Sequence, residues 1–76
     1  MNNKRRKQIE TVRTTLEALM VTVETIRDEE QEAYDNLPDS LQDGTRGERM
    51  TEAIDSLESA LDNLNDANDA LEEAAQ

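Results

Sequence analysis

The chain contains no cysteine, histidine, tryptophan or phenylalanine, and Tyr34 is its single aromatic residue. Without cysteine, neither a disulfide bond nor a thiolate metal site can form. The lack of histidine as well removes the commonest general base and nucleophiles. Neighbouring carboxylates such as Glu72 and Glu73 point in different directions on a helix, so they do not share a site. We therefore predict no catalytic residue, no metal site and no cofactor, and a protein that is not an enzyme.

Long apolar runs are also missing. No run approaches the length of about 18 residues that a membrane-spanning helix needs. The basic start MNNKRRKQ resembles the first part of a signal peptide, but the apolar block of a signal peptide does not follow it. We therefore expect a cytoplasmic protein that makes no contact with membranes.

Basic residues are scarce relative to acidic ones. The formal net charge is −11, from 8 Lys and Arg against 19 Asp and Glu. Phosphate contacts require Lys and Arg, so direct nucleic-acid binding is disfavoured and a basic protein partner is favoured.

The apolar residues that are present follow helical spacing. From Ile9 to Leu37 the spacing between successive apolar residues alternates between three and four, with one interruption at Glu30. With Ile9 as position a of a heptad, they are Ile9, Val12, Leu16, Leu19, Val23, Ile26, Ala33 and Leu37. This alternation places all of them on one stripe of a helix.

The second half repeats the pattern without a gap. Its stripe consists of Met50, Ile54, Leu57, Leu61, Leu64, Asn68, Leu71 and Ala75. Just before each a position stands an alanine, namely Ala53, Ala60, Ala67 and Ala74. Small residues widen the stripe and allow a neighbouring helix to approach closely, which is typical of a bundle. A buried Asn68 would fix the register of the helices, whereas a frayed chain end would leave it in water.

The connector DNLPDSLQDGTRG predicts a turn. Pro38 disfavours helical dihedral angles at Leu37, and Thr45 with Glu48 matches a capping box. We predict an all-α chain with a basic tail at 1–8 and an antiparallel two-helix hairpin at 9–76. Within the hairpin, helices span about 9–36 and 46–75, and a turn spans about 37–45.

A two-helix hairpin leaves part of each apolar stripe in water, so we expect two hairpins to form a homodimer with a four-helix bundle. A monomer and a higher oligomer remain the alternatives. The predicted self-association core is Leu16, Leu19, Val23, Ile26, Ile54, Leu57, Leu61, Leu64 and Leu71.

Charge is distributed unevenly along the second helix. It contains no Lys or Arg after Arg49, although helices that serve only solubility usually alternate the sign of their charges. The candidate partner-binding residues, called here the acidic row, are Glu52, Asp55, Asp62, Asp66, Asp69 and Glu73. A solvated face that keeps the protein soluble is one interpretation of such a row. The alternative is docking on a basic protein, with mimicry of a nucleic-acid backbone as the extreme case.

Two further features have alternative interpretations. The basic run Lys4–Lys7 predicts a solvated tail with local pairing to Glu72, Glu73 and the terminal carboxylate in an antiparallel hairpin, or else a contact with a nucleic acid or another anionic molecule. Tyr34 lies at the flank of the first stripe, where a lone aromatic residue packs at the edge of a core or anchors an interface.

The stretch DEEQEAYDNLPDSLQDGTRGERM, followed by the repeat that begins AIDSLES, resembles small acidic helical proteins of bacteriophages and prophages. The resemblance covers Asp28 to Leu71 and is strongest in EAYDNLPDSLQ and RGERM. It implies a bacterial host cytoplasm and carries no assigned activity to particular residues. Many small phage proteins bind and block a host protein, so the expected function is an accessory or inhibitory binding module. A self-assembling structural or scaffold hairpin is the alternative.

Overall fold

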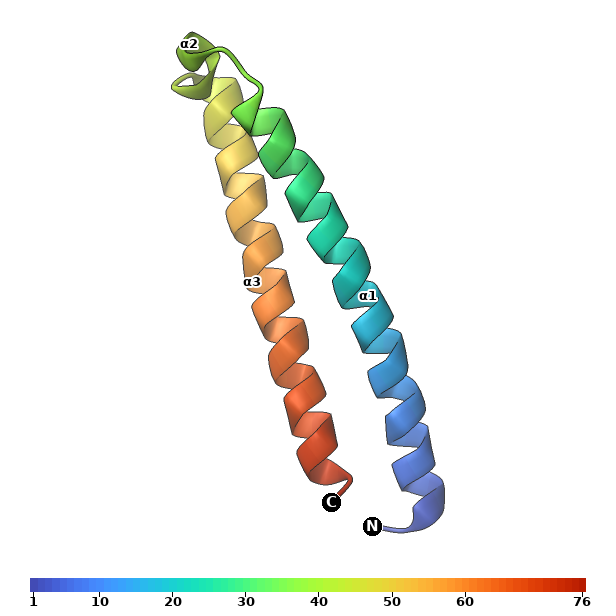
Figure 1. Cartoon of the computed structure of the whole chain (residues 1–76). Coiled ribbons are helices and arrows are strands. Elements are labelled where there is room, and N and C mark those ends of the chain that lie inside the picture. The colour runs from blue at the N-terminus through green and yellow to red at the C-terminus, as the bar shows by residue number, and fades with distance from the viewer.

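The computed structural model describes all 76 residues and contains only helices. Helix α1 spans Asn3–Asp35, the short helix α2 spans Asp39–Gln42, and helix α3 spans Thr45–Ala74. Figure 1 shows α1 and α3 running antiparallel, with α2 at one end and both chain termini at the other. The predicted all-α helical hairpin is therefore confirmed.

Helix α1 begins earlier than the apolar pattern indicates. Asn2 has extended backbone angles, and its side-chain Oδ1 accepts a hydrogen bond from the Arg5 amide at 2.9 Å. This is the standard role of an N-cap asparagine. The basic run Lys4–Lys7 consequently lies inside α1 and not in a separate tail.

The connection contains a four-residue helix that the sequence pattern does not reveal. Helix α1 ends at Asp35, and Pro38 is the N-cap residue of α2. The Gln42 side chain donates a hydrogen bond to the Tyr34 carbonyl oxygen at 3.0 Å, which ties α2 to the end of α1. The expected capping box is absent, because Gly44, and not Thr45, is the N-cap residue of α3 and it makes no side-chain cap bond.

Gly47 is buried where α2 packs against α3. A Cβ atom at this position would lie 2.5 Å from the Gln42 carbonyl carbon and 2.8 Å from Gln42 Cα. Both are backbone atoms, so no side-chain rotation relieves the overlap. The close approach of α2 therefore requires glycine here.

The apolar stripe of α3 faces α1 as the heptad pattern predicts. Ile54 and Leu61 are only 5% and 8% exposed, and Asn68 is 9% exposed. Leu57, Leu64 and Leu71 are half-buried between them. Asn68 is thus part of the packed seam, which excludes the alternative of a frayed end.

Helix α1 is turned relative to the predicted stripe. Its a-position residues Ile9, Leu16 and Val23 are half-buried, as expected. The second inward row, however, consists of Arg13, Met20, Arg27 and Tyr34 at the e positions. The d-position residues Val12, Leu19 and Ile26 are 48%, 50% and 47% exposed.

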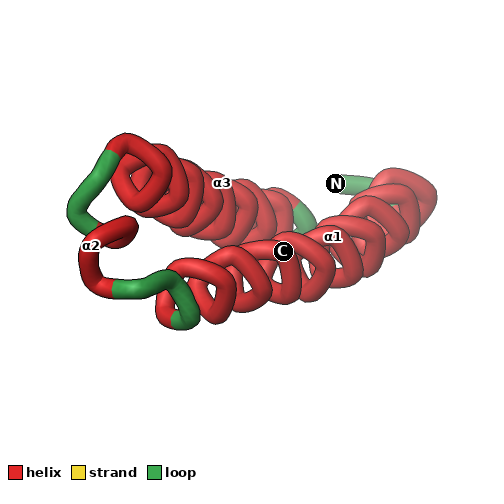
Figure 2. The backbone as a smooth tube through the Cα atoms, turned by 90° about the horizontal axis from the view of Figure 1, so that it is seen from above, coloured by secondary structure: helices red, strands yellow, loops and turns green.

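The two long helices form a single layer with nothing packed above or below it, as the view in Figure 2 shows. The molecule measures 58 × 15 × 12 Å along its principal axes. Along most of its length, each long helix therefore packs only against the other long helix. Neither α1 nor α3 contains a stretch that is long and apolar enough to span a lipid bilayer.

Candidate functional site

All members of the acidic row lie on the exposed surface of α3. None of their carboxylates takes part in an ion pair or a side-chain hydrogen bond. The acidic row is therefore a strip of negative charge on α3 that no ion pair within this chain neutralises. Asp55, Asp62 and Asp69 recur every two turns, which separates them by about 10.5 Å along the helix.

The chain contains two ion pairs, and neither involves the acidic row. Arg13 Nη2 lies 3.4 Å from Glu72 Oε2, and Arg27 pairs with its neighbour Asp28 at 3.0 Å. Within the basic run, Arg6 Nε donates to the Ala75 carbonyl oxygen at 3.0 Å, but no residue of the run pairs with a carboxylate. The expected ion pairs of the run with Glu72 and Glu73 are not formed, and Glu72 pairs with Arg13 instead.

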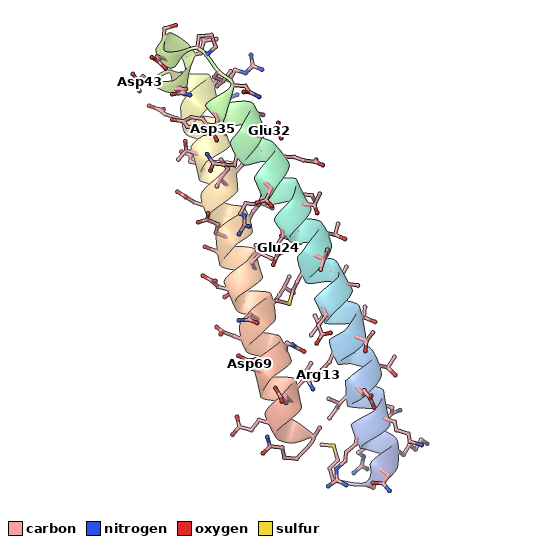
Figure 3. All side chains as sticks on the ribbon, viewed as in Figure 1. Arg13, Glu24, Glu32, Asp35, Asp43 and Asp69 are labelled. Atoms are coloured by element: carbon pink, nitrogen blue, oxygen red, sulfur yellow. The ribbon has the colours of Figure 1, made fainter.

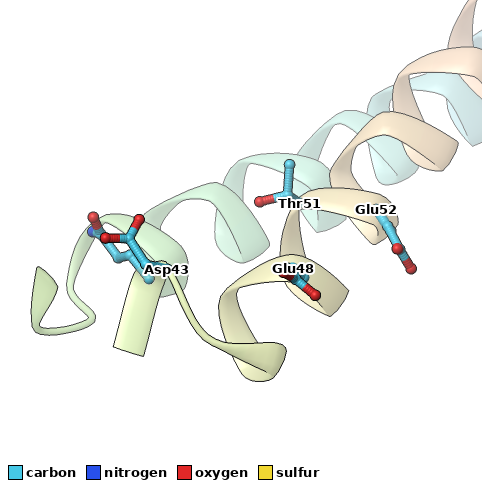
Figure 4. A pocket seen from close by; sticks show the side chains of 5 residues that line it. Asp43, Glu48, Thr51 and Glu52 are labelled. Atoms are coloured by element: carbon cyan, nitrogen blue, oxygen red, sulfur yellow. The ribbon is translucent and has the colours of Figure 1, made fainter. Parts of the chain in front are cut away.

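Three carboxylates surround a shallow hollow at the turn end of the hairpin (Figure 4). Asp43, Glu48 and Glu52 line a shallow hollow of about 400 Å³ together with Gln42 and Thr51. The Thr51 hydroxyl donates to the Gly47 carbonyl oxygen at 2.9 Å. No group of three or more acidic side chains in the structure has the arrangement of a metal site.

Arg13 connects the two long helices near the termini (Figure 3). Its Nε donates to Asn68 Oδ1 at 3.1 Å, and its Nη2 forms the ion pair with Glu72. The polar Asn68 side chain is therefore paired, and the structure contains no buried side-chain N or O atom without a partner. This cluster holds α1 and α3 in one register.

Polar side chains from both helices gather on one side of the seam. A hollow on this side is lined by Met20, Glu24 and Arg27 of α1 and by Leu61, Asp62 and Asn65 of α3. Residues three and four positions after a given helical residue lie on opposite sides of it, because a turn contains 3.6 residues. Leu19 and Met20 therefore flank Leu16 on opposite sides.

The same geometry applies to α3, where Ala60 lies on the side of Leu61 opposite Asn65. Leu19 and Ala60 are therefore on a common side of the hairpin. This side, called here the uncharged face, consists of Val12, Thr15, Leu19, Thr22 and Ile26 on α1, with Ala53, Ala60, Ala67 and Ala74 on α3.

The threonine hydroxyl groups of the uncharged face bond to backbone carbonyl oxygens of their own helix. Thr15 Oγ1 donates to the Thr11 carbonyl oxygen at 3.1 Å, and Thr22 Oγ1 donates to the Ala18 carbonyl oxygen at 3.2 Å. Their hydroxyl groups are thus satisfied within α1. A partner can cover these residues without leaving a polar group unpaired.

The predicted self-association core is divided between these two environments. Leu16, Val23, Leu57, Leu64 and Leu71 are half-buried and Ile54 and Leu61 are buried within the single hairpin, whereas Leu19 and Ile26 lie exposed on the uncharged face. The heptad assignment did not predict that Arg13 and Arg27 face α3, because it counts arginine as polar. The long aliphatic part of an arginine side chain can nevertheless pack against a neighbouring helix. Met20 and Tyr34, which share that edge, were the available signal.

Comparison of the chain with known protein families, with curated proteins and with solved structures found no match.

Proposed function

We propose that this protein is a non-enzymatic binding module that docks the acidic row of α3 on a basic protein in the cytoplasm of a bacterial host. The supporting observation is that every carboxylate of the row is exposed and unpaired. Unpaired charge on a rigid helix attracts a surface of opposite sign and steers the encounter. The bacterial cytoplasm is part of this proposal and is supported by the sequence resemblance to small acidic phage proteins.

A nucleic-acid-binding protein is the class of partner that fits best. Such proteins carry extended basic grooves that contact a line of phosphates. The acidic row offers negative charges in a line along one helix, with Asp55, Asp62 and Asp69 at a regular interval. Occupying such a groove would block it, so the expected effect on the host protein is inhibition.

The working form that we propose is a homodimer in which two hairpins form a four-helix bundle. Only 4 of the 76 residues are buried in the single hairpin, which is a small core for an independent fold. A second candidate function, a self-assembling structural hairpin, is favoured by the exposed Val12, Leu19 and Ile26. A closed dimer fits better than continued growth, because the hairpin has only one such apolar face.

The acidic row is tested by neutralising it without changing the shape of the helix. The variant Asp55→Asn/Asp62→Asn/Asp69→Asn removes three charges from α3. Its matched control, Glu10→Gln/Glu17→Gln/Glu24→Gln, removes three charges at the same spacing from the exposed surface of α1. Each immobilised protein is incubated with a bacterial lysate at low and at high salt, and retained proteins are identified by mass spectrometry.

We expect the unaltered protein and the α1 control to retain the same basic protein at low salt and to release it at high salt. The α3 variant should retain at least about 10-fold less of this basic protein, since each exposed charge at an interface contributes up to about 1 kcal/mol. Equal retention by the α3 variant would refute docking through the acidic row. Recovery of the bait alone would favour the structural candidate.

A further inference from the structure

The surface area of the single hairpin is large for its mass. Its solvent-accessible area is 5597 Å² at 8.6 kDa, whereas a compact monomer of this mass exposes about 4,700 Å². The difference, about 900 Å², is close to the roughly 800 Å² that each partner contributes to a standard stable interface. The excess solvent-accessible area of the hairpin thus equals about the area that one standard interface would bury on it.

The uncharged face is the surface on which this area is best covered. Within Thr11–Ile26 the only charged residues are Arg13, Glu17 and Glu24. Arg13 and Glu24 lie on the opposite, polar side, and Glu17 occupies the same heptad position as Glu24. Val, Ile and Thr are weak helix formers, so an exposed helix face rich in them points to packing and not to solubility.

We propose that the uncharged face binds the same face of a second copy of this chain, with the two α1 helices antiparallel and crossing at Leu19. This inference rests on the homodimer of the proposed function and specifies its interface. Val12 and Ile26 lie seven residues to either side of Leu19. A two-fold axis at Leu19 therefore places Val12 against Ile26 of the partner subunit, and Leu19 against its own copy.

The charges at the two ends of α1 select the antiparallel arrangement. The basic run Lys4–Lys7 lies at one end, and it pairs with no carboxylate of its own chain. At the other end, residues 28–35 contain Asp28, Glu29, Glu30, Glu32 and Asp35 and no Lys or Arg. With the axis at Leu19, the basic run of each copy lies opposite this acidic end of the other copy.

Two other two-fold arrangements bring like charges together. Parallel α1 helices place basic run against basic run and acidic end against acidic end. A two-fold axis along the hairpin, which puts α1 over α3 of the second copy, brings both turn ends to the same end of the dimer. These turn ends carry the acidic end of α1 together with Asp39, Asp43 and Glu48, and Arg46 and Arg49 offset only part of that charge. The remaining net negative charge makes the two turn ends repel each other and disfavours that arrangement. The apolar residues and the opposite charges are placed symmetrically on either side of Leu19. Binding to a different protein would not require this symmetry.

Single cysteines test the arrangement directly, because the natural chain has no cysteine. A disulfide requires Cα atoms within about 7 Å of each other. Under oxidation, Leu19→Cys should form a covalent dimer by itself. Val12→Cys alone should not, since its two copies lie about 20 Å apart along the helix. A mixture of Val12→Cys and Ile26→Cys should cross-link. Ser59→Cys, which is exposed on α3 outside the uncharged face, is the control and should remain monomeric on a denaturing gel.

Each other outcome overturns the proposal. Efficient self-linking of Val12→Cys would indicate parallel helices. Linking of Leu19→Cys only when it is mixed with Ala60→Cys, whose residue lies on the α3 part of the uncharged face, would place α1 over α3 of the second copy. No cross-link, with the unaltered protein sedimenting at 8.6 kDa, would exclude the dimer. This result can be distinguished from a failure of the proposal that the acidic row docks on a basic protein. The retention experiment with the neutralised α3 variant tests that proposal and does not depend on cross-linking.

Discussion

Asn68 is the one polar residue of the seam that is buried, and its position sets the register of the hairpin. It is 9% exposed, and its Oδ1 accepts a hydrogen bond from Arg13 Nε at 3.1 Å. An asparagine buried without a partner would be costly, whereas one that is bonded across the seam penalises every shifted register. The heptad placed Asn68 on the stripe but could not identify Arg13 as its partner.

This pairing predicts a measurable coupling between the two residues. Asn68→Ala and Arg13→Ala, singly and together, should show a coupling free energy of about 1 kcal/mol in urea unfolding, since hydrogen bonds to charged groups are stronger than neutral ones. The control cycle combines Asn68→Ala with Arg27→Ala, because Arg27 bonds to Asp28 and not to Asn68. If both cycles are additive within about 0.3 kcal/mol, Asn68 and Arg13 do not interact in solution.

At the scale of the element, Gly47 shows how a residue that weakens a helix can be required by packing. Glycine inside a helix lowers the stability of the helix by about 1 kcal/mol relative to alanine. From the sequence alone, Gly47 is therefore expected to be unfavourable. In the structure, any Cβ at this position would overlap the backbone of α2 at Gln42. Because α2 is too short to be predicted from periodicity, its contact with Gly47 was not foreseeable from the sequence.

The two glycines of the chain therefore respond differently to substitution. Gly47→Ala should destabilise the hairpin by about 2 kcal/mol or release α2 from α3, since the overlap is with backbone atoms. Gly44→Ala should change stability by no more than about 1 kcal/mol, because its Cβ would lie 3.6 Å from the nearest atom, the Leu41 carbonyl oxygen. Thermal unfolding followed by circular dichroism compares the two. An equal effect of both substitutions would show that α2 does not pack on Gly47.

The two long helices differ in how well their packing could be predicted. On α3, large apolar residues and alanines occupy every inward position except Asn68, so the heptad pattern specifies its inward face. On α1, two rows compete for α3: Val12, Leu19 and Ile26 on one flank, and Met20 and Tyr34 with two arginines on the other. Hydrophobicity favours the first row, but Arg13 reaches two partners on α3 only from the second.

At the scale of the whole molecule, the rotation of α1 separates two surfaces with different chemistry. The row that α1 does not use against α3 becomes the uncharged face, while the acidic row of α3 lies outside the seam. The proposed dimer covers the uncharged face and leaves one acidic row exposed on each copy. The dimer therefore offers two docking strips, which would strengthen binding to a partner with two basic sites.

The mass of the protein in solution tests the central claim, which is that Leu19 lies at the centre of a dimer interface. Sedimentation equilibrium over a range of concentrations compares the unaltered chain with Leu19→Lys and Val21→Lys. Both are apolar residues of α1, and Leu19 is 50% exposed and Val21 62% exposed. They point in different directions from the helix because they are two positions apart.

The unaltered chain and Val21→Lys should sediment as dimers of the 8.6 kDa chain. Leu19→Lys should raise the dissociation constant by about 100-fold or more, because two buried leucine side chains are lost at the two-fold axis. Monomers for all three proteins, or dimers that tolerate Leu19→Lys as well as Val21→Lys, would contradict the account.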